Sequence, residues 1–139
     1  HMEVIATKNG IRYINDSAST NPISTKAALE SISGPVILIA GGVDKNFDYR
    51  VLAPVVQSSD MRGVVLFGRN KKTIRDAIAY EGTKYAPTLQ EALLQAEKMI
   101  GEGGTILFSP ASASFDMFQN SKDRGKQFAR LVKNTKKSA

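Results

Sequence analysis

The sequence predicts a three-layer α/β domain with a mostly parallel sheet and an N-terminal antiparallel hairpin. Continuous apolar runs rich in branched residues, such as Val36–Ala40, are typical of strands buried on both faces of a parallel sheet. Segments with helical spacing alternate with these runs, which implies parallel pairing through right-handed crossovers. The length of 139 residues allows one domain with a substantial core and is short for two.

A hairpin is predicted at the start of the chain. The apolar runs at residues 4–6 and 11–14 flank Asn9-Gly10, a dipeptide that favours a tight turn because both residues tolerate positive φ. A short antiparallel pair of strands should therefore precede the parallel part of the sheet.

A helix is predicted over residues 22–32. Asn21 is a preferred N-cap residue, and Pro22 is the residue most favoured at the first helical position. The chain-breaking segment at residues 33–35 ends the helix. The apolar side chains at helical spacing in this segment are Ile23, Ala27, Ala28 and Ile32.

The same alternation continues toward the C-terminus. Further strands are predicted at residues 36–40, 63–67, 84–86 and 105–108, and further helices at residues 49–57, 71–80, 89–100 and 123–134. The core candidates in the last two helices are Leu93, Leu94, Ala96, Phe128, Leu131 and Val132.

The composition excludes several classes of protein and site. The chain has no cysteine and one histidine, which excludes a disulfide framework and a thiolate metal site and argues against zinc. No apolar run is long enough to cross a bilayer and no signal-peptide pattern opens the chain, so a cytoplasmic location is expected. His1 and Met2 are interpreted as a cloning scar, which leaves residues 3–139 as the domain.

The net charge of +6 bears on the choice of partner. Part of it lies in a terminal segment with Lys133, Lys136 and Lys137, and the other basic residues are scattered without interleaved aromatic residues. This distribution favours the anionic groups of small molecules, or no ligand role, over a nucleic-acid groove.

Polar loops follow several of the predicted strands. In an open parallel sheet, ligands bind beyond the carboxyl ends of the strands, where the loops leave toward the next helices. The loops expected at that edge are rich in glycine, small hydroxyl side chains or charge, and they comprise residues 15–21, 41–45, 68–70 and 109–114. The sequence therefore predicts a site at the strand ends.

Two of these loops could bind an anion. Gly41-Gly42 lets the backbone approach a ligand closely and Lys45 offers a cation, although ordinary turn chemistry explains the glycines equally well. The serine-rich residues 109–114 could surround an anion, although a helix N-cap with serine-rich turns is the simpler explanation. The sequence contains no P-loop, no G-x-G-x-x-G and no G-x-S-x-G pattern.

Four further charged residues have simple interpretations. Asp116 and Asp123 lie near a helix start, where carboxylates more often stabilise the helix dipole than act as acids or bases. Arg69 and Arg124 are expected to be solvated or ion-paired surface groups unless a phosphate lies nearby.

As a set, the polar motifs resemble those of a known family. They are Asn15-Asp-Ser-x-x-Thr20-Asn21, then Gly41-Gly42-x-Asp44-Lys45, then Ser109-Pro-Ala-x-Ala-Ser114-x-Asp116-x-Phe118-x-Asn120, followed by Asp123-Arg-Gly125 and Phe128. In this order and spacing they resemble the C-terminal domain of the Mur ligases. The resemblance is strongest to the members of the family that add D-glutamate. The resemblance covers essentially the whole chain after residue 2 and implies a Rossmann-like domain.

The resemblance implies one domain of a three-domain, ATP-dependent ligase of peptidoglycan synthesis. In the D-glutamate-adding members ATP phosphorylates the carboxylate of UDP-N-acetylmuramoyl-L-alanine, the amine of D-glutamate attacks the acyl phosphate, and an amide, ADP and phosphate result. ATP and Mg²⁺ are bound mainly by a central domain that this chain lacks, so the chain alone is expected to be inactive. A monomer that binds neither membrane nor nucleic acid is expected.

The resemblance also implies roles for individual residues. The residues implied to hold D-glutamate are Thr20, Lys45, Ser114 and, through its backbone amide, Phe115. The residues implied on the nucleotide side of the closed cleft are Asn15, Asp16 and Asn21. Such contacts position the amine for attack, and no catalytic residue or metal ligand is assigned to this domain alone.

Two positions depart from the family pattern, and a second function is open. D-glutamate-adding members commonly have lysine where this sequence has Ala18 and an aromatic residue where it has Ser121. The first change removes a cation from the nucleotide side, and the second removes a wall from the amino-acid pocket, which leaves a different amino acid open. The alternative function is a freestanding α/β module that binds a nucleotide or nucleic acid through its basic surface.

Overall fold

The structure of the protein, a computed structural model, describes residues 2–114 and 117–135. Of the residues considered above, His1, Phe115, Asp116, Lys136 and Lys137 lie outside these ranges. Within them, the strands are β1 (Glu3–Lys8), β2 (Ile11–Asn15), β3 (Val36–Ala40), β4 (Met61–Leu66), β5 (Thr83–Tyr85) and β6 (Gly104–Phe108). The helices are α1 (Pro22–Glu30), the 3-10 helix η1 (Tyr49–Leu52), α2 (Ala53–Val56), α3 (Lys71–Ile78), α4 (Leu89–Ile100) and α5 (Ser121–Asn134).

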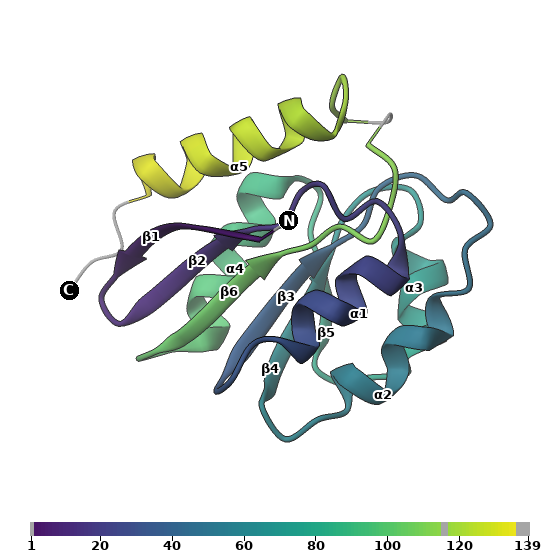
Figure 1. Cartoon of the computed structure of the whole chain (residues 1–139), viewed down its shortest axis with the longest axis horizontal. Coiled ribbons are helices and arrows are strands. Elements are labelled where there is room, and N and C mark those ends of the chain that lie inside the picture. The colour runs from purple at the N-terminus through teal and green to yellow at the C-terminus, as the bar shows by residue number, and fades with distance from the viewer. Residues whose placement is uncertain (1, 115–116, 136–139) are drawn as a thin grey trace.

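The strand pairing confirms the predicted α/β class with a mostly parallel sheet. The strand order is β1-β2-β6-β3-β4-β5 (Figure 1). β1 and β2 are antiparallel, and the pairs β2–β6, β6–β3, β3–β4 and β4–β5 are parallel. Asn9 and Gly10 in the hairpin turn have φ values of 53° and 79°, the left-handed conformation that this dipeptide favours. The predicted N-terminal hairpin is therefore confirmed.

Helices cover both faces of the sheet and complete the three layers (Figure 1). α1, η1, α2 and α3 pack on one face, whereas α4 and α5 pack on the other. The central strand β3 contributes to both cores, because Ile37 and Ile39 pack with α4 and α5 while Leu38 and Ala40 pack with the opposite helices. Burial on both faces explains why β3 is continuously apolar.

The predicted apolar face of helix α1 is only partly confirmed, since Ala28 is buried and Ile32, just after the helix, packs against the core, whereas two other residues do not. Ile23 is 70% exposed, and Ala27 is exposed as well. Thr25 is fully buried instead, because its hydroxyl donates to the Ser109 carbonyl oxygen at 3.3 Å. The buried residues of α1 are Pro22, Thr25, Ala28 and Leu29. The buried face of this helix therefore combines apolar packing with a polar contact to the loop after β6.

The single helix predicted over residues 49–57 is wrong. The chain forms η1 and then the short α2. Pro54 has no N–H to donate to the Arg50 carbonyl oxygen, and the Ala53 N–H donates to that oxygen in a 3-10 bond. The missing donor explains why a regular α-helix does not run through this segment.

The core predicted for the last two helices is confirmed with one exception. Leu93 and Ala96 of α4 and Phe128 and Val132 of α5 are buried, and Leu131 is partly buried against the same core. Leu94, however, is 40% exposed. One step along a helix turns a side chain by about 100°, so Leu94 points away from the face that Leu93 occupies.

A buried polar pair joins β2 to α4. The Tyr13 hydroxyl donates to Glu97 Oε2 at 2.6 Å, and both residues are buried. Burial and the hydrogen bond to Glu97 raise the pKa of Tyr13, so the phenol stays protonated and remains a donor. Lys8 lies 5.1 Å from the centre of the Tyr13 ring and donates to the Thr135 carbonyl oxygen at 2.9 Å. These contacts connect the hairpin to both helices of this face.

We expect Tyr13→Phe to lower the free energy of unfolding by about 1 to 3 kcal/mol, because the buried Glu97 carboxylate loses a donor. Urea unfolding of the chain measures the change. Tyr85→Phe is the matched control, since within the described residues the buried Tyr85 hydroxyl has no hydrogen-bond partner. Its removal should change the free energy by less than about 0.5 kcal/mol. Equal losses in the two variants would contradict this role for the Tyr13 hydrogen bond.

Candidate functional site

The predicted polar loops meet at one edge of the sheet. They follow the carboxyl ends of β2, β6, β3 and β4, which are neighbours in the sheet. The loop after β3 is joined to the loop after β6 by an antiparallel bridge in which the Val43 N–H donates to the Ala113 carbonyl oxygen at 2.9 Å. The Gly41 N–H donates to the Pro110 carbonyl oxygen at 3.0 Å. The loops therefore form one connected surface.

Asn70, at the start of α3, connects the loop after β3, the loop after β6 and η1. It is 2% exposed, and its Oδ1 accepts the Gly42 N–H at 2.9 Å. Its Nδ2 donates to the Tyr49 hydroxyl at 2.9 Å and to Ser112 Oγ at 2.8 Å. Burial raises the pKa of Tyr49, so the phenol stays neutral in this network. Asn70 thus fixes the loops after β3 and β6 relative to η1.

Asp16 organises the loop after β2. It is 1% exposed, and its Oδ2 accepts the hydroxyls of Ser19 at 2.6 Å and Ser109 at 2.7 Å. The Ser109 hydroxyl also lies 2.8 Å from Thr25 Oγ1 on α1. The carboxylate therefore connects the loop after β2 to the loop after β6 and to α1. Its implied contact with a nucleotide stays a prediction.

Asn15 and Asn21 shape the same loop through local hydrogen bonds. Asn15 Oδ1 accepts the Ser17 N–H at 3.1 Å. Asn21 Oδ1 accepts the Ser24 N–H at 2.9 Å, which confirms the predicted N-cap of α1. A hollow of about 380 Å³ beside this loop is lined by Met2, Asp16, Ala18, Ser19, Ser24, Ala27, Ala28 and Ser31. Asn15 and Asn21 do not line this hollow, and their implied nucleotide roles stay predictions.

Arg124 is buried, and the prediction of a surface group is wrong. It has no exposed area, and its Nη1 and Nη2 donate at 2.9 Å to the carbonyl oxygens of Ser112 and Ser17, respectively. The spacing held the missing signal, because Arg124 lies four residues before Phe128 and eight before Val132 on one face of α5. The guanidinium therefore ties α5 to the loops after β2 and β6.

The other charged residues agree with their simple interpretations where the structure describes them. Asp123 lies in the first turn of α5, and its Oδ2 accepts the Gln119 N–H at 3.1 Å and a Gln127 amide N–H at 3.1 Å. Arg69 is exposed. Asp123 thus stabilises the start of the helix, as predicted.

Three of the residues implied to hold D-glutamate line one pocket. Thr20 comes from the loop after β2, Lys45 from the loop after β3 and Ser114 from the loop after β6. The pocket has a volume of about 350 Å³ and is lined by Thr20, Lys45, Phe47, Ala113, Ser114, Asn120 and Ser121. Phe115 lies outside the described residues. The fold thus brings together three distant segments at one pocket.

The pocket combines a cation with the positive end of a helix. Lys45 supplies the ammonium group, and Asn120 and Ser121 belong to the N-terminus of α5. Asn120 Oδ1 accepts the Asp123 N–H at 2.8 Å, and the first N–H groups of a helix carry partial positive charge. The Lys45 ammonium group and the N-terminus of α5 are therefore two positive poles in the lining of this pocket, and each can bind an anionic group.

Sequence reasoning missed two residues of this region. The partners of Asn70 lie 21 to 42 residues away in the chain, so its role as a buried connector has no local signal. Phe47 lines the pocket only two residues after Lys45, and its ring packs on Tyr49 with 6.2 Å between ring centres. An aromatic residue so close to a predicted binding lysine is a signal that could have identified it.

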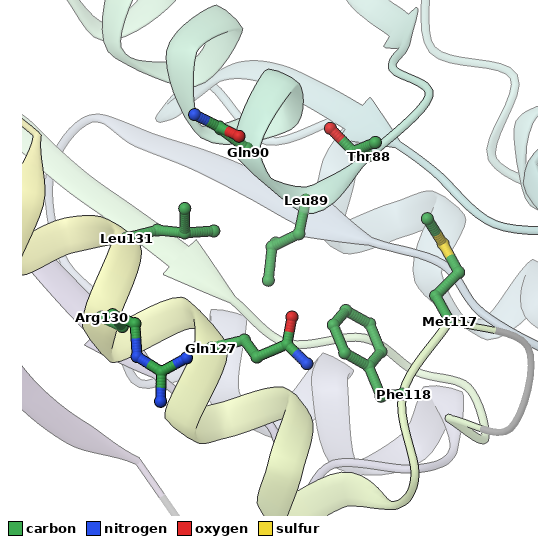
Figure 2. A pocket seen from close by; sticks show the side chains of 8 residues that line it. All are labelled: Thr88, Leu89, Gln90, Met117, Phe118, Gln127, Arg130 and Leu131. Atoms are coloured by element: carbon green, nitrogen blue, oxygen red, sulfur yellow. The ribbon is translucent and has the colours of Figure 1, made fainter.

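A separate hollow of about 290 Å³ lies between α4 and α5 (Figure 2). Figure 2 shows Leu89 of α4 and Leu131 of α5 pointing into the space between the helices, with the Phe118 ring beside them. The lining residues are Thr88, Leu89, Gln90, Met117, Phe118, Gln127, Arg130 and Leu131. The hollow shares no residue with the pocket at the strand ends. The polar loops of the sheet therefore converge on the other pocket.

The described residues contain neither a cluster suited to a metal ion nor a helix suited to a membrane. In residues 2–114 and 117–135, no group of three or more His, Cys, Asp or Glu side chains could hold a metal ion. No helix in that part of the chain is long and apolar enough to cross a membrane.

The chain is similar to curated ligases. It is 42% identical over 134 residues to the UDP-N-acetylmuramoylalanine--D-glutamate ligase of Hydrogenovibrio crunogenus, a match that covers 94% of this chain and 30% of that protein. It is 40% identical over 139 residues to the ligase of the same name from Pelotomaculum thermopropionicum, and this match covers 98% of this chain and 30% of that protein. The chain therefore spans about 30% of the length of these relatives.

A solved structure shares the fold. It is a UDP-N-acetylmuramoylalanyl-D-glutamyl-2,6-diaminopimelate--D-alanyl-D-alanyl ligase from Acinetobacter baumannii, with a TM-score of 0.60 and 18% sequence identity. The match covers 96% of this chain and 28% of that one. The family model described as "Mur ligase, glutamate ligase domain" matches residues 2–112. The sheet order, the connected loops and these matches agree that the chain belongs to the family of Mur ligase glutamate ligase domains.

Proposed function

We propose that this chain is the amino-acid-binding domain of an ATP-dependent ligase that joins D-glutamate to UDP-N-acetylmuramoyl-L-alanine in peptidoglycan synthesis. The names of its relatives support the reaction, although the chain spans about 30% of their length. The observation that carries the proposal is the convergence of Thr20, Lys45 and Ser114 on one pocket. The full-length enzyme would be a cytoplasmic monomer.

The pocket residues would orient the amino acid. Lys45 would bind one carboxylate of D-glutamate through a charge-assisted hydrogen bond. Ser114, the backbone amide of Phe115 and the N-terminus of α5 would hold the other carboxylate, and Thr20 would contact the amino acid from the loop after β2. An amine held in one position attacks an acyl phosphate far faster than a freely diffusing one. The contribution of this domain is therefore orientation.

The nucleotide would lie on the other side of the loop after β2. Asp16, Asn15 and Asn21 would face it there, with the Asp16 network keeping the loop in shape. ATP and Mg²⁺ would be bound mainly by parts of the enzyme outside this chain, and they would supply the activated carboxyl group as an acyl phosphate. The chain alone would then show no turnover.

Phosphate release by the full-length enzyme tests the proposal. Release that requires ATP, UDP-N-acetylmuramoyl-L-alanine and D-glutamate together is expected, with L-glutamate and other D-amino acids as controls. The isolated chain, assayed in parallel, is expected to release none. Release that depends on a different amino acid would reject D-glutamate as the substrate, and no release by the full-length protein would reject the ligase.

We expect Lys45→Ala in the full-length enzyme to raise the Michaelis constant for D-glutamate about 10- to 150-fold. A hydrogen bond to a charged group contributes roughly 1.5 to 3 kcal/mol, and every 1.4 kcal/mol is tenfold. The constants for ATP and the UDP substrate should stay within about twofold, because Lys45 binds neither. Lys98→Ala is the control, since Lys98 is an exposed residue of α4 outside the pocket. An unchanged constant for D-glutamate in Lys45→Ala would contradict the assigned role.

A further inference from the structure

The candidate pocket has one large apolar surface. Among its described lining residues, Phe47 is the one aromatic residue and Ala113 is the other apolar one. Phe47 is half-buried and packs against the core that α1, η1 and α3 form with the sheet. A ligand in this pocket therefore meets polar groups on most sides and a hydrocarbon surface at Phe47.

The Phe47 ring is held from behind by buried groups. It packs edge-to-face on Tyr49, with an angle of 86° between the ring planes, a favourable aromatic geometry. Tyr49 is 2% exposed, and its hydroxyl accepts a hydrogen bond from Asn70 Nδ2 at 2.9 Å. Asn70 in turn binds Gly42 and Ser112. The position of the ring thus depends on the rigid base of the site as well as on its own loop.

A turn brings the cation and the ring to the same pocket. Asn46, between them, has a φ of 62°, and its N–H donates to Asp44 Oδ1 at 2.8 Å. Lys45 and Phe47 on either side of this turn both line the pocket. Ser121, the first residue of α5, lines it with a small side chain, so the large apolar contact comes from Phe47.

We propose that Phe47 determines the side-chain length of the amino acid that the pocket accepts. The inference rests on the proposed function. A carboxylate bound by Lys45 anchors one end of the ligand, and the methylene groups between its two carboxylates lie against the ring. Aspartate has one methylene group fewer, so it cannot span the two positive poles and also cover the ring. In an apolar pocket one methylene group changes kcat/KM by about 10- to 200-fold.

The test compares D-glutamate, D-aspartate and D-2-aminoadipate as substrates of the full-length enzyme. We expect the unmodified enzyme to prefer D-glutamate over D-aspartate at least tenfold in kcat/KM, the lower end of the value of one methylene group. Phe47→Ala should reduce this preference at least about fivefold, mainly through a higher KM for D-glutamate. Phe47→Ala should also reduce the difference in kcat/KM between D-glutamate and D-2-aminoadipate. The KM for ATP should stay within about twofold.

Two further variants separate selectivity from folding. Phe47→Leu keeps an apolar side chain against Tyr49 and should retain most of the preference for D-glutamate. Leu94→Ala removes a large exposed apolar side chain from α4, outside the pocket, and should leave the preference unchanged. Should Phe47→Ala not fold, Phe47→Val provides the same comparison with less loss of volume.

The outcomes distinguish this inference from the function on which it rests. No turnover of D-glutamate by the unmodified enzyme would overturn both. Turnover with an unchanged ratio of D-glutamate to D-aspartate in folded Phe47→Ala would overturn the role of Phe47 and leave the ligase intact. An equal rise of KM for all three amino acids would also overturn it, because a length-selecting wall must affect them unequally.

Discussion

Gly41→Ala is expected to lower the free energy of unfolding of this chain by about 3 to 5 kcal/mol. Gly41 directly follows β3 and has a φ of 126°, a backbone conformation that side chains rarely adopt. A Cβ atom there would lie 1.7 Å from the Phe67 carbonyl oxygen, far inside contact distance. Backbone strain of this kind is worth roughly 1 to 3 kcal/mol, and overpacking adds a similar amount.

Gly34→Ala is the matched control for Gly41→Ala. Gly34 also has a positive φ, of 85°, but a Cβ atom there would meet no described atom within 4 Å. Gly34→Ala should therefore lower the free energy of unfolding by about 1 to 2 kcal/mol, the cost of backbone strain without overpacking. Urea unfolding followed by circular dichroism measures both variants. Equal losses would show that the close approach of Gly41 to Phe67 is unimportant.

The close approach at Gly41 also matters for the site. The Gly41 N–H donates to the Pro110 carbonyl oxygen, and Val43, two residues later, forms the bridge to Ala113. A shift of the backbone at Gly41 would displace Lys45 relative to Ser114. The glycine that ordinary turn chemistry explains is therefore also a requirement for the shape of the pocket, because only a residue without a Cβ fits against Phe67.

Arg124→Met is the second variant with a large expected effect, a loss of about 3 to 5 kcal/mol in the free energy of unfolding. The guanidinium donates to the carbonyl oxygens of Ser112 and Ser17 in a buried setting, and each hydrogen bond to a charged group contributes roughly 1.5 to 3 kcal/mol. Methionine fills much of the same space but leaves both carbonyl oxygens without this donor. Urea unfolding measures the loss.

Two controls accompany Arg124→Met. Arg130→Met changes an exposed arginine of the same helix and should alter the free energy of unfolding by less than about 0.5 kcal/mol. Arg124→Lys keeps the charge but cannot reproduce the fork of donors, so it should recover less than half of the loss. A loss for Arg124→Met as small as that for Arg130→Met would refute the role of the buried guanidinium.

Local sequence signals were sufficient for most of the fold. Asn9-Gly10 predicts its turn because few residues tolerate positive φ, and Asn21-Pro22 predicts the start of α1 because both residues satisfy helix-terminal constraints. The apolar run of β3 predicts a strand buried on both faces. Pro54 shows the limit, since a single missing N–H divides a segment whose composition alone suggested one helix.

The candidate site depended on two kinds of information. The rule that ligands bind beyond the carboxyl ends of parallel strands identified the loops, and the resemblance of their motifs assigned Thr20, Lys45 and Ser114. The connecting role of Asn70 was not predicted, although its loop was, because it lies in contacts with Tyr49, Gly42 and Ser112 that no local pattern records.

By itself, the sequence determined the order and type of the elements, the turn of the hairpin and the edge of the sheet at which polar loops gather. Tertiary structure alone decided that Thr25 is buried while Ile23 and Leu94 are exposed, and it supplies the carbonyl oxygens that the buried Arg124 binds. The physical reason is the range of the interactions. Capping, turn formation and hydrophobic periodicity act between residues close in the chain, whereas a buried polar group is stable only when distant segments supply its hydrogen-bond partners.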